Sequence, residues 1–339
     1  MVFGDWPSSN FSFNPQGWVH DEAMAAEHGH RLNGMLVGLL TLGLFAWVYT
    51  VESRRWVRRT AVAALLLVAF QGLLGGLRVL MDSLLAAKIH GCLAQIFFGL
   101  LVTLWLSQRP FFSRYGPAAS APDRHASPVS AGFVAGGFAL AALTLVQLVI
   151  AATMRHLGAG LAIQTFPLTP QGGLLPELWS APVAIHFAHR AVALVIFLGW
   201  CGWAWLAWRQ WSRLPLFART LFAVFSALLW VQIALGASVI WTGRNAWITT
   251  AHVIVGAYTL ASLWALAFTL WCTRQRARHS WARHQRAPFQ GTRFQRTRRQ
   301  RAPRDGSQPA AARAAHPNAS EARAETGSPA LTPQSTPVS

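Results

Sequence analysis

The stretch RLNGMLVGLLTLGLFAWVYTV, residues 31–51, decides the fold, because its only charged residue stands at its first position. About twenty apolar residues in a helix cover about 30 Å, which is the thickness of the hydrocarbon core of a bilayer. In lipid such a stretch must be helical, since no water is present to bond its backbone. Six further stretches of this kind follow, at residues 60–80, 88–107, 131–153, 184–208, 218–241 and 250–272. The sequence therefore predicts an all-α polytopic membrane protein with seven visible transmembrane helices.

The composition argues against an ordinary soluble protein. The chain has 339 residues, of which 53% are hydrophobic and 12% are charged, whereas soluble domains carry about 25% charged residues. A net charge of +18 can indicate nucleic-acid binding, but here the arginines gather in alternate loops and in the C-terminal tail, as membrane topology requires. We therefore predict contact with membrane lipids and no specific nucleic-acid partner. The three cysteines form no CxxC or CxxCH pattern, which argues against disulfide frameworks, zinc sites and covalent haem attachment.

The distribution of arginine predicts the orientation and the domains. Arginines follow the first, third, fifth and seventh spans, while the first thirty residues contain acids and neither Lys nor Arg. The N-terminus is therefore expected outside the membrane and the C-terminus in the cytoplasm. We divide the chain into five segments. They are an extracytoplasmic segment (1–30), a three-helix haem-binding half (31–107), a cytoplasmic linker (108–130), a four-helix haem-binding half (131–272) and a basic disordered tail (273–339).

The two halves form an internal repeat. EHGHRLNG (27–34), QGLLGG (71–76) and KIHGCLAQ (88–95) match HFAHRAVA (186–193), QIALGA (232–237) and TAHVIVGA (250–257). Repeats are frequent in membrane folds, and a four-span second half predicts a four-span first half. The fourth span, which ends in QLVIAATMRH (147–156), has no visible counterpart in the first half. We therefore expect a fold of eight helices whose first helix lies upstream of Met1, with a true seven-helix chain as the alternative.

Four histidines occupy matching places in this repeat. His30, His90, His189 and His252 each stand near the outer end of an odd-numbered span. Parallel helices lie diagonally in a four-helix bundle, which places His30 opposite His90 and His189 opposite His252. Two imidazoles that face each other across an apolar bundle suit the axial positions of a haem iron. The alternatives are a structural role, or a zinc or copper site, but only two histidines converge in each half.

Four arginines lie near the same outer ends. Arg31 and Arg190 directly follow the first histidine of each pair, and Arg78 and Arg155 close spans two and four. At this depth all four are candidates to pair with haem propionates through charge-assisted hydrogen bonds. For Arg78 and Arg155, extension to the membrane interface is an equal alternative.

The halves differ three residues before the first histidine of each pair. Glu27 stands there in the N-terminal half and His186 in the C-terminal half. Position i−3 lies on the same helix face, so the Glu27 carboxylate would lie close to any haem bound at His30. A carboxylate there can move protons, or it can simply complement the helix dipole. The asymmetry predicts that the N-terminal half reacts and that the C-terminal half holds a cofactor.

These residues resemble the haem A synthase family, which acts in cytochrome oxidase assembly. The resemblance rests on an ordered set of motifs, namely EHGHR (27–31), LAAKIHG (85–91), MRHLGAGLAIQTFPL (154–168), FAHR (187–190) and TAHVIVGA (250–257). GDWPSS (4–9) is similar to the external loop that follows the first helix of the family. The resemblance implies a bacterial inner-membrane enzyme of eight helices that converts haem O to haem A by O₂-dependent oxidation of a ring methyl to a formyl group.

The resemblance also implies roles for individual residues. Glu27, His30 and His90 would act on the substrate haem O, and His189 and His252 would hold a haem b. The implied partners are a haem O synthase that delivers the substrate and an electron donor; a homo-oligomer is left open. Two features depart from the family. The first helix is not visible, which would leave the N-terminal pocket open on one side and the chain inactive as written, and the paired external-loop cysteines of some members are absent.

Two other functions remain open from the residues alone. The first is a di-haem b-type membrane cytochrome that passes electrons to or from quinol, which would need the four histidines but not Glu27. The second is a transporter or an assembly factor whose histidines handle protons or metal, which would bind no haem.

Overall fold

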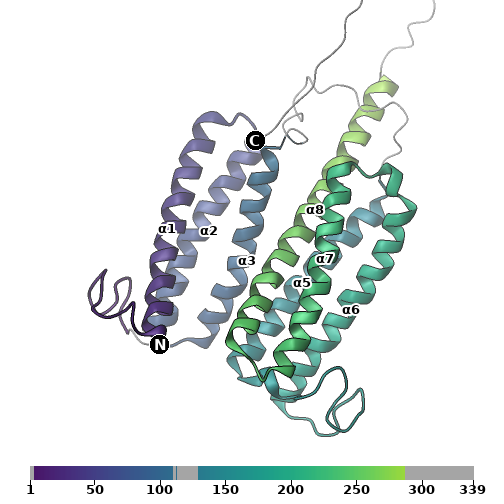
Figure 1. Ribbon diagram of the computed structural model, residues 1–339. Helices are drawn as coiled ribbons and strands as arrows, with labels where there is room; N and C mark the ends of the chain where they lie inside the picture. Colours follow the sequence, from purple (N-terminus) through teal and green to yellow (C-terminus); the bar gives the residue numbers. More distant parts are fainter. Residues whose placement is uncertain (1–3, 110–111, 113–128, 287–339) are drawn as a thin grey trace, which may run out of the picture. The chain divides into compact units, whose positions relative to one another are not determined.

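The computed structural model describes residues 4–109, 112 and 129–286 (Figure 1). Within these ranges, seven helices are long and apolar enough to cross a membrane. The protein is therefore an all-α integral membrane protein, as the sequence predicts. The helices are α1 (Glu22–Val51), α2 (Arg55–Leu80), α3 (Leu84–Ser107), α5 (Ala131–His156), α6 (Ala181–Arg209), α7 (Leu216–Trp241) and α8 (Ala246–Arg286).

Several helices extend beyond the apolar spans from which they are predicted. Helix α1 begins at Glu22 rather than at residue 31, so the predicted extracytoplasmic segment ends in a helix. Helix α8 continues to Arg286 rather than ending at residue 272, so the predicted tail begins as a helix. Apolar runs mark only the part of a helix that lipid covers, and the Ala, Gln and Arg residues beyond Cys272 are good helix formers. Residues 113–128 of the linker and 287–339 of the tail lie outside the described residues.

Side-chain caps fix the start of each helix that carries a candidate histidine. Asp21 accepts from the backbone N–H of Met24 at the start of α1. Serines cap α3 and α6, and Asn245 accepts from two backbone N–H groups of α8. Because the first N–H groups of a helix lack a partner within the helix, such oxygens favour a start at that residue.

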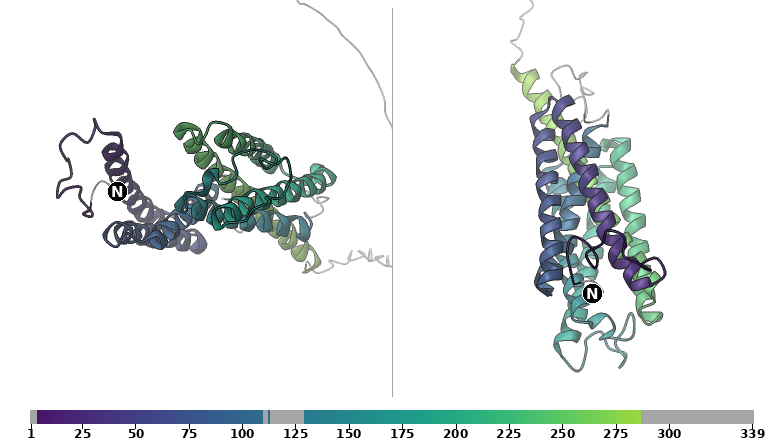
Figure 2. Two further views of the ribbon diagram at one scale, coloured as in Figure 1. Left: turned by 90° about the horizontal axis from the view of Figure 1, so that it is seen from below. Right: turned by 90° about the vertical axis from the view of Figure 1, so that its left-hand side faces the viewer.

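The N-terminal half consists of α1, α2 and α3. Helices α1 and α3 both pack against α2 (Figure 2, left). The three helices share an apolar core toward the end that is remote from the histidines, formed by Val48, Val57, Ala61, Ala64, Phe97 and Leu104. Small residues on α2 let the helices approach closely there, which is how helices associate where lipid supplies no hydrophobic driving force.

The C-terminal half consists of α5–α8, with α8 as its most buried helix. The most apolar window of α8 is 56% buried, compared with 11% for that of α1. Helix α8 contacts α5 and α7, while α6 lies against α5. A large aromatic side chain on α6 bridges α5 and α7. Trp203 is 3% exposed, stacks on Phe133 of α5 and donates its indole N–H to the Phe133 carbonyl. Its ring also lies 5.4 Å from that of Phe222 of α7, between centroids.

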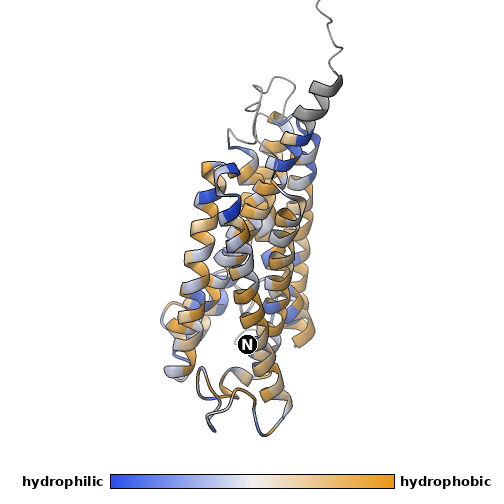
Figure 3. Cartoon of the chain, turned by 90° about the vertical axis from the view of Figure 1, so that its right-hand side faces the viewer, coloured by the Kyte–Doolittle hydropathy of each residue, from blue (hydrophilic) through white to orange (hydrophobic). Residues whose placement is uncertain are grey.

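The basic loops meet at one end of the helices. Arg54 donates to the backbone carbonyls of Ser107 and Phe112, and Arg274 donates to that of Val129. Figure 3 shows apolar residues along the helices and hydrophilic residues toward their ends. The opposite end carries the four candidate histidines and two segments outside the long helices, residues 4–21 and 157–180, which precede α1 and α6.

Candidate functional site

The four histidines occupy the same register in both halves. His30 and His189 are each the ninth residue of their helix, and His90 and His252 are each the seventh. At 1.5 Å per residue, these positions lie about 12 Å and about 9 Å below the helix start. The rings therefore sit in the second and third turns, one turn or more deeper than the first-turn placement that the apolar spans suggest.

In the N-terminal half, His30 of α1 meets His90 of α3. Their ring centroids are 6.1 Å apart, with the ring planes at 79°. Two metal–nitrogen bonds of about 2 Å each, with about 1 Å from each nitrogen to its ring centre, give about 6 Å. The spacing therefore fits two axial ligands of one iron. His90 is half-buried, whereas His30 is exposed, because α1 packs mainly on α2.

In the C-terminal half, His189 of α6 and His252 of α8 are both half-buried. The Nδ1 atom of His252 is buried and has no hydrogen-bond partner in the part of the chain that the structure describes. A buried polar atom without a partner is costly, and an iron ligand bond would satisfy a ring nitrogen of this kind. A Cβ at Gly236 would come within 3.1 Å of the His252 ring, and one at Gly75 within 3.6 Å of the His90 ring. Glycine therefore makes room for the ring in both halves.

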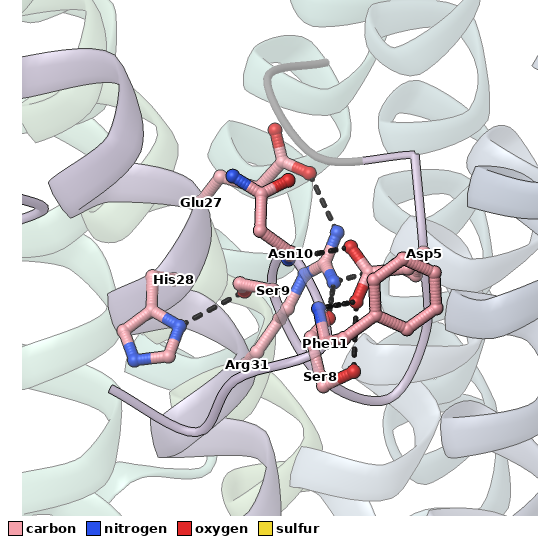
Figure 4. A network of polar contacts seen from close by, with 8 residues as sticks. All are labelled: Asp5, Ser8, Ser9, Asn10, Phe11, Glu27, His28 and Arg31. Carbon is pink, nitrogen blue, oxygen red and sulfur yellow. Dashed lines mark hydrogen bonds and ion pairs between the residues drawn. The ribbon is translucent and has the colours of Figure 1, made fainter. Parts of the chain in front are cut away.

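An external segment is fastened across the start of α1 by Arg31 (Figure 4). The guanidinium donates to the backbone carbonyls of Asp5, at 2.7 Å, and of Ser8. It also forms an ion pair with Glu27 one turn earlier, at 2.8 Å. The Arg31 side chain is 8% exposed and that of Glu27 is 20% exposed, so water reaches this pair only partly. We call residues 4–12 the N-terminal strap.

The N-terminal strap is organised around the Asp5 carboxylate. It accepts hydrogen bonds from the backbone N–H groups of Asn10 and Phe11 and from the Ser8 hydroxyl, at 2.7–3.0 Å. Desolvation alone would raise the pKa of Asp5, but these hydrogen bonds outweigh it and hold the pKa at about 2. Ser9 is fully buried and its hydroxyl lies 2.9 Å from Nδ1 of His28.

The C-terminal half repeats this fastening. Arg190 donates to the backbone carbonyls of Ile163, at 2.9 Å, and Thr165, at 2.6 Å. It also donates to Nε2 of His186 one turn earlier, at 3.2 Å, while Nδ1 of His186 accepts from the backbone N–H of Ile163. Residues 159–168 thus form a C-terminal strap. Glu27 and His186 are equivalent in three dimensions, each bound by the arginine that follows the first histidine of the pair.

Comparison with known proteins shows the family to which the chain belongs. The sequence profile of the family described as "Cytochrome oxidase assembly protein" matches residues 19–264, which is more than half of the chain. The chain belongs to this family. It is 36% identical over 206 residues to a heme A synthase of Symbiobacterium thermophilum, and the match covers 58% of this chain and 63% of that protein. The match therefore spans less than two thirds of the length of this relative.

Further members of the family show the same relationship. A heme A synthase of Halalkalibacterium halodurans is 27% identical over 242 residues, covering 70% of this chain and 76% of that protein. A heme A synthase of Anaplasma marginale is 27% identical over 253 residues, covering 70% and 68%. The resemblance to haem A synthases seen in the sequence motifs is thereby confirmed.

The four arginines that we predicted from the sequence to bind haem propionates fall into two groups. Arg31 and Arg190 hold the two straps, and their pairing with propionates stays a prediction. Arg78 is half-buried near the outer end of α2 and Arg155 is exposed at the end of α5. Neither donates a hydrogen bond to another described residue, so their guanidinium groups are available to an anionic ligand.

Sequence reasoning missed the straps. The partners of Arg31 are backbone carbonyls more than twenty residues upstream, and backbone carbonyls carry no signature in a sequence. The only available signal was the shared pattern of an aromatic residue followed by proline, at Trp6–Pro7 and Phe166–Pro167. His28, which directly follows Glu27, is 2% exposed, beneath the strap and against Trp18.

Proposed function

We propose that this protein is a haem A synthase, which oxidises one ring methyl of haem O to the formyl group of haem A. His30 and His90 would bind the substrate haem O, with Glu27 as the acid–base group. His189 and His252 would hold a haem b. The family and the relatives support haem A biosynthesis. The spacing of His30 and His90, and the helix register that both histidine pairs share, support the assignment of the sites.

One observation carries the proposal more than any other. The two halves share helix register, histidine positions and strap arginines, yet the group that each strap arginine holds is Glu27 in one half and His186 in the other. A site that only carries electrons needs no carboxylate beside the haem, whereas proton transfer needs a group that can accept and release a proton. The asymmetry therefore supports the proposal that the chemistry takes place in the N-terminal half.

The reaction balances as two hydroxylations of one methyl carbon. Each consumes one O₂, two electrons and two protons, places one oxygen atom on the carbon and releases the other as water. The resulting geminal diol then loses water to give the formyl group. Glu27 lies three residues before His30 on the same helix face, where its carboxylate can accept a proton and pass it on. The Arg31 ion pair holds that carboxylate in one place at 2.8 Å.

The C-terminal half would serve electron supply. A haem b with two histidine ligands carries single electrons when it is bound. His189 and His252 lie on α6 and α8, and Gly236 leaves space for the His252 ring. Arg78 and Arg155 are the residues that we assign to propionate pairing, because their guanidinium groups carry no other described hydrogen bond and lie near the same ends of their helices.

The orientation and the partners complete the proposal. The basic ends of the helices would lie in the cytoplasm and both straps outside the bacterial inner membrane, following the arginine distribution. The substrate would come from a haem O synthase. The five segments defined from the sequence stand as proposed domains, with the boundary shifts at Glu22 and Arg286 already described.

The test is haem extraction and chromatography from cells that make a haem O synthase, lack their own haem A synthase and express this gene. The chain is expressed as printed and with any in-frame upstream codons. We expect haem A or hydroxylated haem O. Glu27→Ala should abolish both while haem b remains bound. Glu22→Ala is the matched control, because Glu22 lies in the exposed first turn of the same helix.

Each result decides between the candidate functions. Haem b alone from every form, with no product, would contradict the synthase and indicate the di-haem cytochrome. Protein without haem in any form would contradict both, and would leave the transporter or assembly factor. Product formation by Glu27→Ala at the parent level would remove the acid–base role of that carboxylate.

A further inference from the structure

We propose that three glutamines, Gln71, Gln147 and Gln232, are positioning residues for three of the four histidines. Each lies on a helix that neighbours a histidine-bearing helix and reaches that histidine with its side-chain amide. This inference rests on the proposed function, since it assigns what orients the iron ligands. The three motifs QGLLGG, QLVIAATMRH and QIALGA contain these residues, and none of the roles assigned so far uses them.

The contacts repeat across three helix pairs. Gln71 of α2 donates to the backbone carbonyl of His90 at 2.9 Å, and Nδ1 of His90 lies 3.2 Å from the backbone carbonyl of Gln71. Gln147 of α5 donates to the backbone carbonyl of His189 at 2.8 Å, and the same nitrogen lies 3.0 Å from Nδ1 of the ring. The glutamine thus fixes both the backbone and the ring at these histidines.

The third contact is on α7 and α8. The amide nitrogen of Gln232 lies 3.3 Å from Nε2 of His252. A Cβ on Gly256, one turn after His252, would come within 3.0 Å of this amide nitrogen. Only glycine at that position leaves room for Gln232 in its present place. The glutamine engages one ring nitrogen, and the other, Nδ1, has no hydrogen-bond partner among the described residues.

A small residue follows each glutamine one helical turn later. Gly75 follows Gln71 and Gly236 follows Gln232, and each of these glycines faces the ring of the histidine that the glutamine contacts, at 3.6 and 3.1 Å from a built Cβ. Ala151 holds the corresponding place after Gln147. At His252 both the Gln232 amide and the Gly236 backbone lie against the ring, so the ring cannot turn freely between them.

The amide suits this task for a chemical reason. The Oε1 atoms of Gln71, Gln147 and Gln232 are all buried and have no hydrogen-bond partner in the described part of the chain. An amide group offers a donor and an acceptor in one plane. A half-turn of the Gln147 amide would give up its hydrogen bond to the His189 backbone carbonyl and present Oε1 to a protonated Nδ1 of His189, which leaves Nε2 for iron. Outer-shell hydrogen bonds of this kind set the orientation and basicity of a metal-ligating histidine.

The fourth histidine lacks this arrangement. Within the described residues no glutamine amide bonds to His30, whose ring instead faces that of His90. Within the described residues, both histidines of the C-terminal pair and one of the N-terminal pair thus contact a glutamine amide.

The test uses the purified full chain with its bound haem b. Gln147→Leu and Gln232→Leu are compared with Thr144→Val and Ser238→Ala, whose hydroxyls lie on the same helices and bond only to their own helix among the described contacts. The readouts are the low-spin electron paramagnetic resonance g values, which report ring orientation, and the rate of haem transfer to apomyoglobin. We expect shifted g values and haem loss at least about tenfold faster in the glutamine variants, and values near the parent in the controls.

A further variant keeps the test decisive if a leucine variant does not fold. Gln147→Glu preserves the shape and offers a stronger acceptor to Nδ1, so it should retain haem and lower its reduction potential. Leucine variants with parental g values and haem loss, or a glutamate variant with an unchanged potential, would overturn the role of the glutamines. A parent protein that shows no low-spin haem at all would instead contradict the proposed haem site.

Discussion

Replacing Arg31 with alanine should release the N-terminal strap from α1. The Arg31 guanidinium makes two hydrogen bonds to strap carbonyls in addition to its ion pair with Glu27. A hydrogen bond with a charged donor contributes about 1.5–3 kcal/mol. Water replaces part of this when the carbonyls become exposed, so we take the lower figure for each bond. The strap should therefore be about 3 kcal/mol easier to open, which is about a hundredfold in the opening equilibrium.

A buried thiol can measure this opening directly. Ser9 belongs to the strap and is fully buried, with its hydroxyl against His28 of α1, so Ser9→Cys should react with a thiol reagent only when the strap opens. The measurement uses a chain in which Cys92, Cys201 and Cys272 are replaced by serine. Arg31→Ala should raise the labelling rate about a hundredfold. Arg31→Lys should give a smaller increase, because one ammonium group cannot reproduce the fork of the guanidinium.

Arg190→Ala is the matched control for this measurement, since it removes the same fastening from the C-terminal strap. It should leave labelling at position 9 unchanged. A labelling rate for Arg31→Ala within twofold of the parent would refute the reasoning, because it would show that the strap is held by other contacts.

Three further predictions concern the strap and the core. Gly76→Ala should loosen the strap by about 1–3 kcal/mol, because the added Cβ would lie 2.9 Å from the Trp6 indole. The labelling rate of Ser9→Cys should therefore rise. Gly72→Ala on the same helix is the control and should leave this rate unchanged, because a Cβ at Gly72 has no atom within 4 Å. Trp203→Ala should lower the free energy of unfolding in detergent by about 3–5 kcal/mol, whereas Trp208→Ala, at an 81% exposed position, should leave the thermal midpoint near that of the parent. The folded-state pKa of Asp5 lies near 2, below its ordinary value of 3.8, so the carboxylate should stabilise the strap above about pH 4 and lose this effect as the pH falls toward 2. Trp6 fluorescence should follow that loss, and a profile in Asp5→Asn that matches the parent would contradict it.

The fold was largely predictable from the sequence, because each span is an apolar run long enough to cross a bilayer and is bounded by polar or charged residues. Residues 31–51 alone define a membrane helix, and the other spans follow from the same arithmetic. The helix ends were less predictable. Asp21 sets the start of α1 by capping it, and the polar residues between Asp21 and Arg31 are helical without being apolar. Hydropathy measures contact with lipid, and a helix can extend beyond the lipid.

The candidate site was predictable only where it repeats. The spacing of His30 and His90 in one half and of His189 and His252 in the other identified the pairs, and the structure brings the first pair within ring contact. Their roles as iron ligands, and the roles of Glu27, Arg78 and Arg155, stay predictions. The use of Arg31 and Arg190 could not be foreseen, because their partners are backbone carbonyls of loops whose path depends on the folded chain.

The most direct test of the account is the haem content of four purified histidine variants, each isolated from cells that also make a haem O synthase. We predict that His189→Ala and His252→Ala lose haem b and keep haem O or its oxidised product. His30→Ala and His90→Ala should keep haem b and lose the other haem. The same haem composition in all four variants and in the parent would contradict the claim that each half holds its own haem on its own pair of histidines.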